Sequence, residues 1–202
     1  MNSHFFQSVC VFLILVLAAG CGEETSSLPK PRSFPRVLYP AGDMEPFKLE
    51  VCPFSFSKPS YTVVERDTVY FDEKPLNPCW FDIVTPSLNG RVHLSYYPVT
   101  SLAEFEKHRD DAYTLVGKHN IVANYIDEVP ISRPKSDVTG FAFDIDGDVA
   151  SPFQFFVTDS TSHFLRGALY VQAKASSDSL APIYQFLRED ALEVLKTLEW
   201  DN

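Results

Sequence analysis

The chain has 202 residues and a formal charge of −10, because 27 aspartates and glutamates outnumber 17 lysines and arginines. A surface this acidic repels nucleic acid and anionic lipid head groups, so neither is an expected partner. The 17 phenylalanines and 9 tyrosines, against only 8 glycines, indicate a packed core and exclude a disordered or low-complexity chain.

The first feature in chain order is an apolar run from Val9 to Ala19 that leads directly to Gly20 and Cys21. Small residues followed at once by a cysteine are typical of a bacterial lipoprotein processing site. An ordinary signal peptide or a membrane span is the alternative, but a run of about eleven residues is far short of the roughly twenty that cross a bilayer. The pattern predicts a signal peptide over residues 1–20 and lipidation of Cys21, although residues 1–8 lack the usual lysine or arginine.

Acidic and small polar residues follow, and then Pro29, Pro31 and Pro35 favour an extended backbone. Residues 21–36 are therefore predicted to be a flexible, lipid-anchored tether. At about 3.1 Å per residue it could hold the following domain up to roughly 45 Å from the lipid surface. A single globular domain is expected over residues 37–202.

Two cysteines remain after Cys10 is removed with the signal and Cys21 is lipidated. Outside the cytoplasm Cys52 and Cys79 could pair. A bridge between them would close a loop of about 28 residues and stabilise the fold by roughly 3–4 kcal/mol on the chain-entropy model. The alternative is two separate buried thiols, because each cysteine has a proline and an aromatic residue beside it.

The first part of the expected domain is rich in strand signals. Residues 39–50 contain Pro40, Gly42 and Pro46 and are predicted to be irregular. Residues 52–57 alternate apolar and polar side chains as a strand does, and residues 61–65 form a second short strand candidate with residues 69–71 as its expected partner.

Two further alternating runs, residues 79–84 and 91–96, are joined by a connection that ends in Asn89-Gly90. Both residues tolerate the positive φ that a type I′ turn demands, so the runs are predicted to pair as an antiparallel hairpin. His93 falls on the more polar side of the second run with Arg91 and Ser95. This placement favours a surface histidine over a metal ligand.

The remaining elements alternate between helical and strand patterns. Ser101 and Glu104 have capping-box spacing and open an amphipathic helix that runs to about Lys118. Strands are predicted at residues 121–131, 140–145, 151–158 and 163–173. The last should be central, because it is apolar on both faces.

A final helix is expected after an N-cap at Asp178-Ser179, with an apolar stripe that ends at Trp200. The order of elements predicts an α+β fold, in which an antiparallel sheet of about six or seven strands is packed by two main helices.

The stretch Asp144-Ile145-Asp146-Gly147-Asp148 invites comparison with a calcium loop. An EF-hand needs glycine at its sixth position and glutamate at its twelfth, where this chain has Val149 and Phe155. A plain hairpin turn is therefore expected, with a weak, irregular calcium site as the alternative.

A carboxylate, a hydroxyl and an imidazole lie close together at Asp159, Ser160 and His163. Catalytic serines usually sit on a strained, glycine-flanked turn, which is missing here. A side-chain-capped turn between two strands explains the same residues. Histidine and cysteine spacings also match no metal site, so the chain is predicted to be no enzyme and to hold no metal or cofactor.

Several motifs in one order cover nearly the whole mature chain. They include Cys21, Pro29-Lys30-Pro31-Arg32, Cys52-Pro53-Phe54-Ser55-Phe56, Asn77-Pro78-Cys79-Trp80, residues 89–96, Thr158-Asp159-Ser160, residues 163–170 and Asp178-Ser179-Leu180-Ala181-Pro182. Together they resemble the gliding-motility lipoprotein GldD family. The resemblance implies a cell-envelope lipoprotein required for gliding, in machinery that overlaps with type IX secretion. The order of strands and helices is also similar to that of the PsbP/Mog1-like sandwich, by analogy only.

The leading hypothesis is a lipid-anchored accessory subunit of the outer membrane that binds other motility or secretion proteins. Its membrane contact would be the lipid, palmitate included, on Cys21. One alternative is a periplasmic or surface module that binds a glycan through Trp80, Tyr96 and Tyr97. Another is an envelope hydrolase built around Ser160 and His163.

Overall fold

The computed structural model describes residues 36–66, 77–172 and 177–201. The predicted signal peptide at 1–20, the lipidated Cys21, nearly all of the predicted tether at 21–36 and the expected strand at 69–71 lie outside these ranges. The domain boundary at residue 37 stays a prediction.

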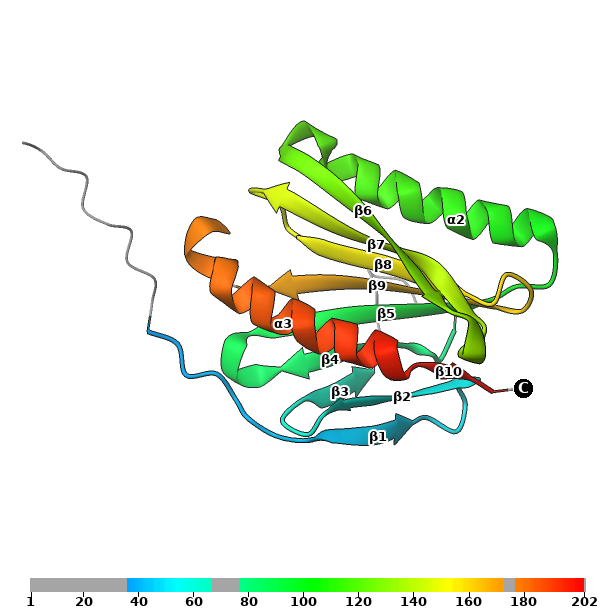
Figure 1. The fold of residues 1–202 in the computed structure, drawn as a ribbon, viewed down its shortest axis with the longest axis horizontal. Coiled ribbons are helices and arrows are strands. Elements are labelled where there is room, and N and C mark those ends of the chain that lie inside the picture. Colours follow the sequence, from blue (N-terminus) through cyan, green and yellow to red (C-terminus); the bar gives the residue numbers. More distant parts are fainter. Residues whose placement is uncertain (1–35, 67–76, 173–176, 202) are drawn as a thin grey trace, which may run out of the picture. The chain divides into compact units, whose positions relative to one another are not determined.

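The main element is a seven-stranded sheet with the order β3-β4-β5-β9-β8-β7-β6, in which every pair of neighbours is antiparallel. Its strands are β3 (Val63–Arg66), β4 (Trp80–Thr85), β5 (Gly90–Pro98), β6 (Ala123–Arg133), β7 (Val138–Gly147), β8 (Phe153–Thr158) and β9 (His163–Val171). The prediction that the strand beginning at His163 is central is confirmed, because β9 lies in the middle of this order (Figure 1).

A second sheet has three strands in the order β1-β2-β10, namely β1 (Met44–Lys48), β2 (Phe54–Pro59) and β10 (Glu199–Trp200). The prediction that residues 39–50 are irregular was wrong for residues 44–48, which form β1. Pro46 is tolerated in β1 because β1 is an edge strand, where a missing N–H breaks no ladder on the outer side. β3 pairs with β4, and the strand expected at residues 69–71 as a partner of residues 61–65 lies outside the described ranges.

The two main helices are α2 (Leu102–Gly117) and α3 (Ser177–Thr197), and short 3₁₀ helices lie at η1 (Pro86–Leu88), η2 (Lys118–Ile121) and η3 (Pro134–Ser136). The Ser101 side chain caps α2 by accepting a hydrogen bond from the Glu104 N–H at 3.3 Å. The final helix begins earlier than predicted, at Ser177, and ends at Thr197. Trp200 therefore belongs to β10, not to the helix.

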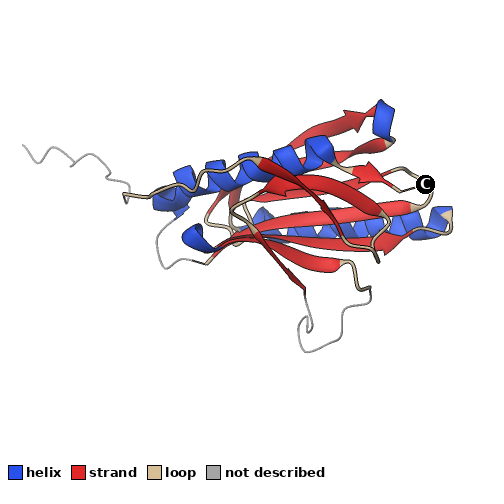
Figure 2. Cartoon of the chain, turned by 90° about the horizontal axis from the view of Figure 1, so that it is seen from below, coloured by secondary structure: helices blue, strands red, loops and turns tan. Residues whose placement is uncertain are grey.

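The helices cover opposite faces of the large sheet (Figure 1) because the side chains of each strand alternate. In β8, Phe155 belongs to the core beneath α3 with Leu187, whereas Phe156 belongs to the core beneath α2 with Val116. The strands of both sheets can be followed in red in Figure 2. The predicted class, an antiparallel α+β fold with about seven strands and two main helices, is confirmed.

Cys52 and Cys79 form a disulfide, with their Cα atoms 5.5 Å apart and both side chains almost fully buried. Cys52 precedes β2 of the small sheet, and Cys79 precedes β4 of the large sheet. The bridge therefore joins the two sheets.

The hairpin of β4 and β5 pairs antiparallel as predicted, but its turn differs. Asn89 adopts the left-handed conformation at φ 49°, whereas Gly90 does not and already pairs with Thr85. Gly90 is needed for another reason, because a Cβ there would lie 2.3 Å from the Cδ1 atom of Leu187. The type I′ prediction was wrong since packing against α3, not the turn, requires this glycine.

Candidate functional site

Three polar side chains of β4 and β5 form a buried chain of hydrogen bonds on the face of the sheet opposite α3. The Nδ1 atom of His93 lies 2.7 Å from Asp82 Oδ1, and its Nε2 atom lies 3.0 Å from the Ser95 hydroxyl. A carboxylate can only accept, so Nδ1 carries a proton that it donates to Asp82. The prediction of a surface histidine was wrong, because the His93 side chain is only 5% exposed.

This chain of hydrogen bonds continues on both sides. Arg91 donates from Nη1 to the second oxygen of Asp82 at 2.6 Å. The Asp82 carboxylate is therefore bound by the guanidinium of Arg91 and by the imidazole of His93. At the other end Tyr97 lies beside Ser95. Burial raises the pKa of Tyr97, against the opposing effects of the Arg166 charge and a hydrogen bond with Ser95.

A second polar group lies on the next strands of the same face. Arg166 of β9 donates to Gln154 of β8 at 2.9 Å, and the Gln154 amide lies 2.9 Å from the Nε2 atom of His119. Burial, and then the Arg166 charge, lower the pKa of His119. Ser95 and Arg166 are directly opposite in the β5–β9 register, so the two groups form a polar row across the sheet.

The order Asp82–His93–Ser95 is that of the relay in many acyl hydrolases, where the imidazole takes the serine proton. Ser95 differs from such a nucleophile in its placement. It lies in the middle of a regular strand, opposite Trp80 and Arg166, and is only 3% exposed. Nucleophilic serines lie on sharp, exposed turns, so the arrangement fits a structural network better than a catalytic one.

The sequence conceals this network because Arg91, His93 and Ser95 alternate with apolar residues as a solvent-facing edge would. The only available signal was the hairpin register, which places Asp82 directly opposite His93. Throughout the described residues, every buried side-chain nitrogen or oxygen has a hydrogen-bond partner. The polar row therefore satisfies itself.

The turn after β8 has the geometry that the sequence favoured. The Asp159 carboxylate accepts backbone N–H bonds from Thr161, Ser162 and His163 at 2.8–3.0 Å, and Ser160 is left-handed at φ 66°. Burial by itself would raise the pKa of Asp159, but these donors together hold the pKa below its ordinary value. The carboxylate therefore serves to cap the turn.

The imidazole of His163 forms its hydrogen bond with Tyr96 and not with Ser160. Its Nδ1 atom is 2.9 Å from the Tyr96 hydroxyl, and its ring stacks on Trp200 with centroids 5.0 Å apart. Burial, followed by the Asp159 charge, raises the pKa of Tyr96 to about 12, so the phenol stays protonated and can donate to the imidazole. Ser160 and His163 thus do not form the pair that the hydrolase alternative needs.

The aromatic residues considered for a glycan are mostly packed. Trp80 and Tyr96 are 7% and 4% exposed, and the indole N–H of Trp80 donates to the Tyr96 carbonyl at 3.0 Å. An aromatic ring that does line a hollow is Trp200, which shares a space of about 250 Å³ with Asp137, Asp159 and Glu199.

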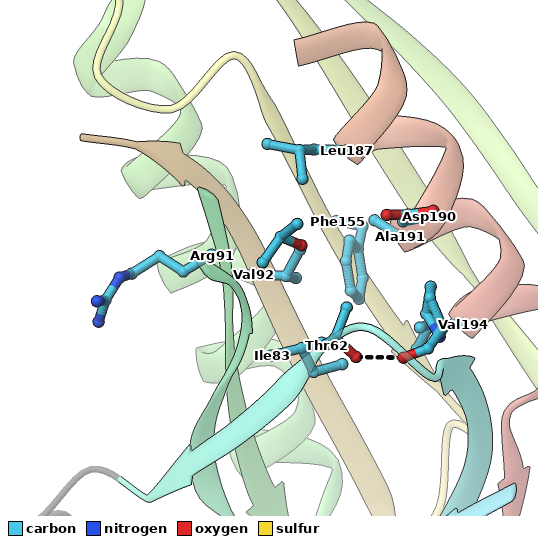
Figure 3. A pocket seen from close by; sticks show the side chains of 11 residues that line it. Thr62, Ile83, Arg91, Val92, Phe155, Leu187, Asp190, Ala191 and Val194 are labelled. Carbon is cyan, nitrogen blue, oxygen red and sulfur yellow. Dashed lines mark hydrogen bonds between the residues drawn. The ribbon is translucent and has the colours of Figure 1, made fainter. Parts of the chain in front are cut away.

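The pocket shown in Figure 3 lies under α3 and is nearly filled by its own side chains. Its volume of about 10 Å³ has room for roughly one water molecule. Ile83, Val92 and Phe155 line it from the sheet, and Asp190 lies at its α3 side (Figure 3). The guanidinium of Arg91 points away from it (Figure 3).

Asp190 is the titratable group of this pocket. Its carboxylate accepts a hydrogen bond from the Tyr61 hydroxyl, which lies 2.7 and 2.8 Å from the two oxygens. Burial raises the pKa of Asp190 from 3.8 to about 6, although the Tyr61 hydrogen bond opposes the shift. Space for one water and a protonatable carboxylate suit a stability role better than ligand binding.

The larger hollow lies between β6, the end of β7 and the first half of α3, with a volume of about 630 Å³. Asp144, Asp146 and Asp148, the residues compared with a calcium loop, line it. Asp144 is paired with Arg188 of α3, and Asp146 accepts from the Asn124 amide at 2.8 Å. In the ranges that the structure describes, no group of three or more acidic, histidine or cysteine side chains is placed to hold a metal ion.

Aromatic and apolar residues complete this hollow. Phe153 and Leu169 form part of its lining from the sheet, and Tyr184 contributes from α3. Val122, just before β6, and Tyr125, in β6, complete the lining. Ile121, next to Val122, is 91% exposed. The hollow is thus an open, acidic depression with an apolar rim, and it is the best candidate for a docking site on the described surface.

Fold and surface together define an α+β module whose single large sheet carries a helix on each face and leaves this hollow open beside α3. The family model for gliding motility lipoprotein GldD matches residues 24–200, and the chain belongs to that family. Membership makes it a lipid-anchored protein of the cell envelope with a role in gliding motility.

No curated protein matches the chain. A solved structure that does is the solution structure of cyanobacterial PsbP (CyanoP) from Synechocystis sp. PCC 6803. The two share 8% sequence identity at a TM-score of 0.43, over 80% of this chain and 94% of that one.

Within the described ranges, no helix has both the length and the apolar character needed to cross a bilayer.

Proposed function

We propose that this lipoprotein is a non-enzymatic accessory subunit that is held at the outer membrane by the lipid on Cys21. In this role it binds other proteins of the gliding machinery and of the linked type IX secretion system. Family membership supports the setting, and the lipoprotein signal supports the anchor, with palmitate among its acyl chains.

The observation that carries the binding role is a group of exposed apolar side chains where η2 meets β6. Ile121, Val122 and Tyr125 are 91%, 53% and 62% exposed. Contiguous apolar surface on a soluble domain is a common mark of a protein interaction site. Here the apolar surface adjoins the 630 Å³ hollow, so it combines exposed apolar side chains with a concave site.

Deletion of the gene and complementation with variants test this function. The full chain should restore colony spreading and release of secreted cargo, and should fractionate with the outer membrane and take up an alkyne-tagged palmitate. The variant Cys21→Ser should show none of these four properties. A wild-type chain found in the soluble fraction with an unacylated amino terminus, or a deletion strain that still spreads and secretes, would overturn the proposal.

Glycan binding is a second candidate, favoured by the hollow at Trp200. An indole beside carboxylates is a common way to hold a sugar ring, because the ring stacks and its hydroxyls donate to the acidic oxygens. Titration of the protein with envelope oligosaccharides, followed through the Trp200 indole NMR signal, should shift that signal and leave the buried Trp80 unchanged. No shift at saturating sugar would exclude this site.

A further inference from the structure

The hollow beside α3 has a charge pattern that indicates what fits it, and this inference rests on the binding role proposed above. We propose that the hollow receives a segment of a partner protein that presents a lysine or arginine next to an apolar side chain. Asp146 and Asp148 would pair with the basic group, and Val122 and Tyr125 would contact the apolar one.

The acidic side of the hollow keeps an excess of negative charge. Arg188 is its basic residue, and this guanidinium is already held by both oxygens of Asp144 through its Nε and Nη2 atoms. Asp146 and Asp148 are exposed, and the Asp146 carboxylate has only a neutral amide donor from Asn124 among its described side-chain contacts. Among the residues that the structure describes, no cation pairs with these two carboxylates, which line the hollow.

The apolar side lies directly beside these carboxylates. Val122 lies between η2 and β6, Tyr125 lies in β6, and Asp146 is opposite Tyr125 in the β6–β7 register. On the other wall Tyr184 lies close enough to Asp148 for that charge, after burial, to raise the pKa of the phenol. An amphipathic side-chain pair would thus meet matching apolar and acidic groups within one depression.

Other occupants fit this surface less well. A second copy of the chain would bring another net charge of −10 and its own acidic hollow, so the contact would be repulsive. Anionic lipid or nucleic acid would be repelled for the same reason. A volume of about 630 Å³ accommodates a few side chains of a short segment and is too small for a folded domain.

Site-specific photocrosslinking in living cells tests the proposal with the full lipid-anchored chain. A benzoylphenylalanine at position 125 would replace Tyr125, and a matched control would replace Leu102, which is 70% exposed at the start of α2. We expect crosslinking at position 125 and not at 102. Mass spectrometry should map the crosslink to a partner segment with a lysine or arginine within about three residues of an apolar side chain.

Charge reversal tests the same site independently. The double variant Asp146→Lys/Asp148→Lys should reduce the crosslink at position 125 at least tenfold and abolish spreading. The control Glu106→Lys/Asp110→Lys changes the same number of exposed charges on α2 and should behave like wild type. Both proteins should keep the wild-type melting temperature, and replacement of the partner's basic residue by aspartate should restore binding to the lysine variant.

The outcomes separate this inference from the proposed function. If wild type crosslinks to a partner elsewhere and the lysine variant still binds it and supports spreading, the hollow is not the docking site, but the accessory role stands. If the mapped segment is acidic, or comes from a second copy of this chain, the inference is wrong. If no position on the domain gives a partner, both proposals fail.

Discussion

Arg188 of α3 and Asp144 of β7 form a bidentate ion pair that holds the helix against the sheet, although the two residues are 44 positions apart in the sequence. The guanidinium also lies over the Phe153 ring, 5.3 Å from its centroid. The pair forms one wall of the hollow, so the same contact that positions α3 also shapes the candidate docking site.

This ion pair should contribute modestly to stability, because its side chains are 35% and 28% exposed and solvent screens them. In a double-mutant cycle, Arg188→Ala and Asp144→Asn should each cost about 1–2 kcal/mol in urea unfolding and should couple by about 1 kcal/mol. The more exposed pair Arg109–Asp110 is the control and should couple by less than about 0.5 kcal/mol. Equal coupling in the two cycles would contradict this ranking.

The Cys52–Cys79 bridge should be a major source of stability, since it closes a loop in the unfolded chain and joins the two sheets. Cys52→Ser/Cys79→Ser is expected to lower the unfolding free energy by roughly 3–4 kcal/mol. Denaturant titration measures the loss, and wild type with dithiothreitol should lose a similar amount. Recovery of both cysteines in alkylated form from the unreduced, secreted protein would show that they are not bridged.

The Asp82–His93–Ser95 network should matter for folding and not for catalysis. His93→Ala would leave Asp82 buried with a lost partner, so a loss of about 2–4 kcal/mol is expected. Ser95→Ala should cost about 1 kcal/mol and leave colony spreading intact. A fluorophosphonate probe should not label Ser95, whereas labelling of wild type that is lost in Ser95→Ala would show a reactive nucleophile.

Asp190 should give the protein a measurable pH dependence. Its folded-state pKa of about 6 lies above its ordinary value of 3.8, so the folded state binds the extra proton between these values. Its charge is therefore destabilising above about pH 6, and the penalty is relieved as the pH falls toward about 4.

The variant Asp190→Asn removes this titration and keeps the shape of the side chain. Scanning calorimetry at about pH 7.5 and about pH 4.5 measures the difference in melting temperature between Asp190→Asn and wild type. The gain in melting temperature of the variant over wild type should be larger at about pH 7.5. Asp159→Asn is a control of opposite sign, because its folded-state pKa is lowered and its contribution is lost on acidification. If wild type and Asp190→Asn differ in melting temperature by the same amount at both pH values, the pKa of Asp190 is not raised.

Local patterns predicted much of the fold. The alternation in residues 91–96, the cap at Ser101 and the apolar stripe of α3 each depend on neighbours a few residues away, and the expected strands and helices were found there. Errors arose where a distant partner decided the outcome. Residues 44–48 form a strand because β2 pairs with them, and Glu199 and Trp200 form one because β2 also offers its other edge.

The candidate site shows the same division. Composition and spacing singled out Asp144, Asp146 and Asp148, but only the packing of α3 on the sheet shows that Arg188 neutralises Asp144 and that the others border a hollow. His93 was placed at the surface because a strand pattern reports which side chains share a face, not whether that face is covered.

The sequence by itself determined the class of fold, the family and the expected lipid anchor, because these depend on local periodicity and on motifs contiguous in the chain. Only the tertiary structure decided which polar groups are buried and where a partner could dock. Burial and shape arise from contacts between residues far apart in sequence, such as Asp144 with Arg188, and no local pattern encodes such pairs.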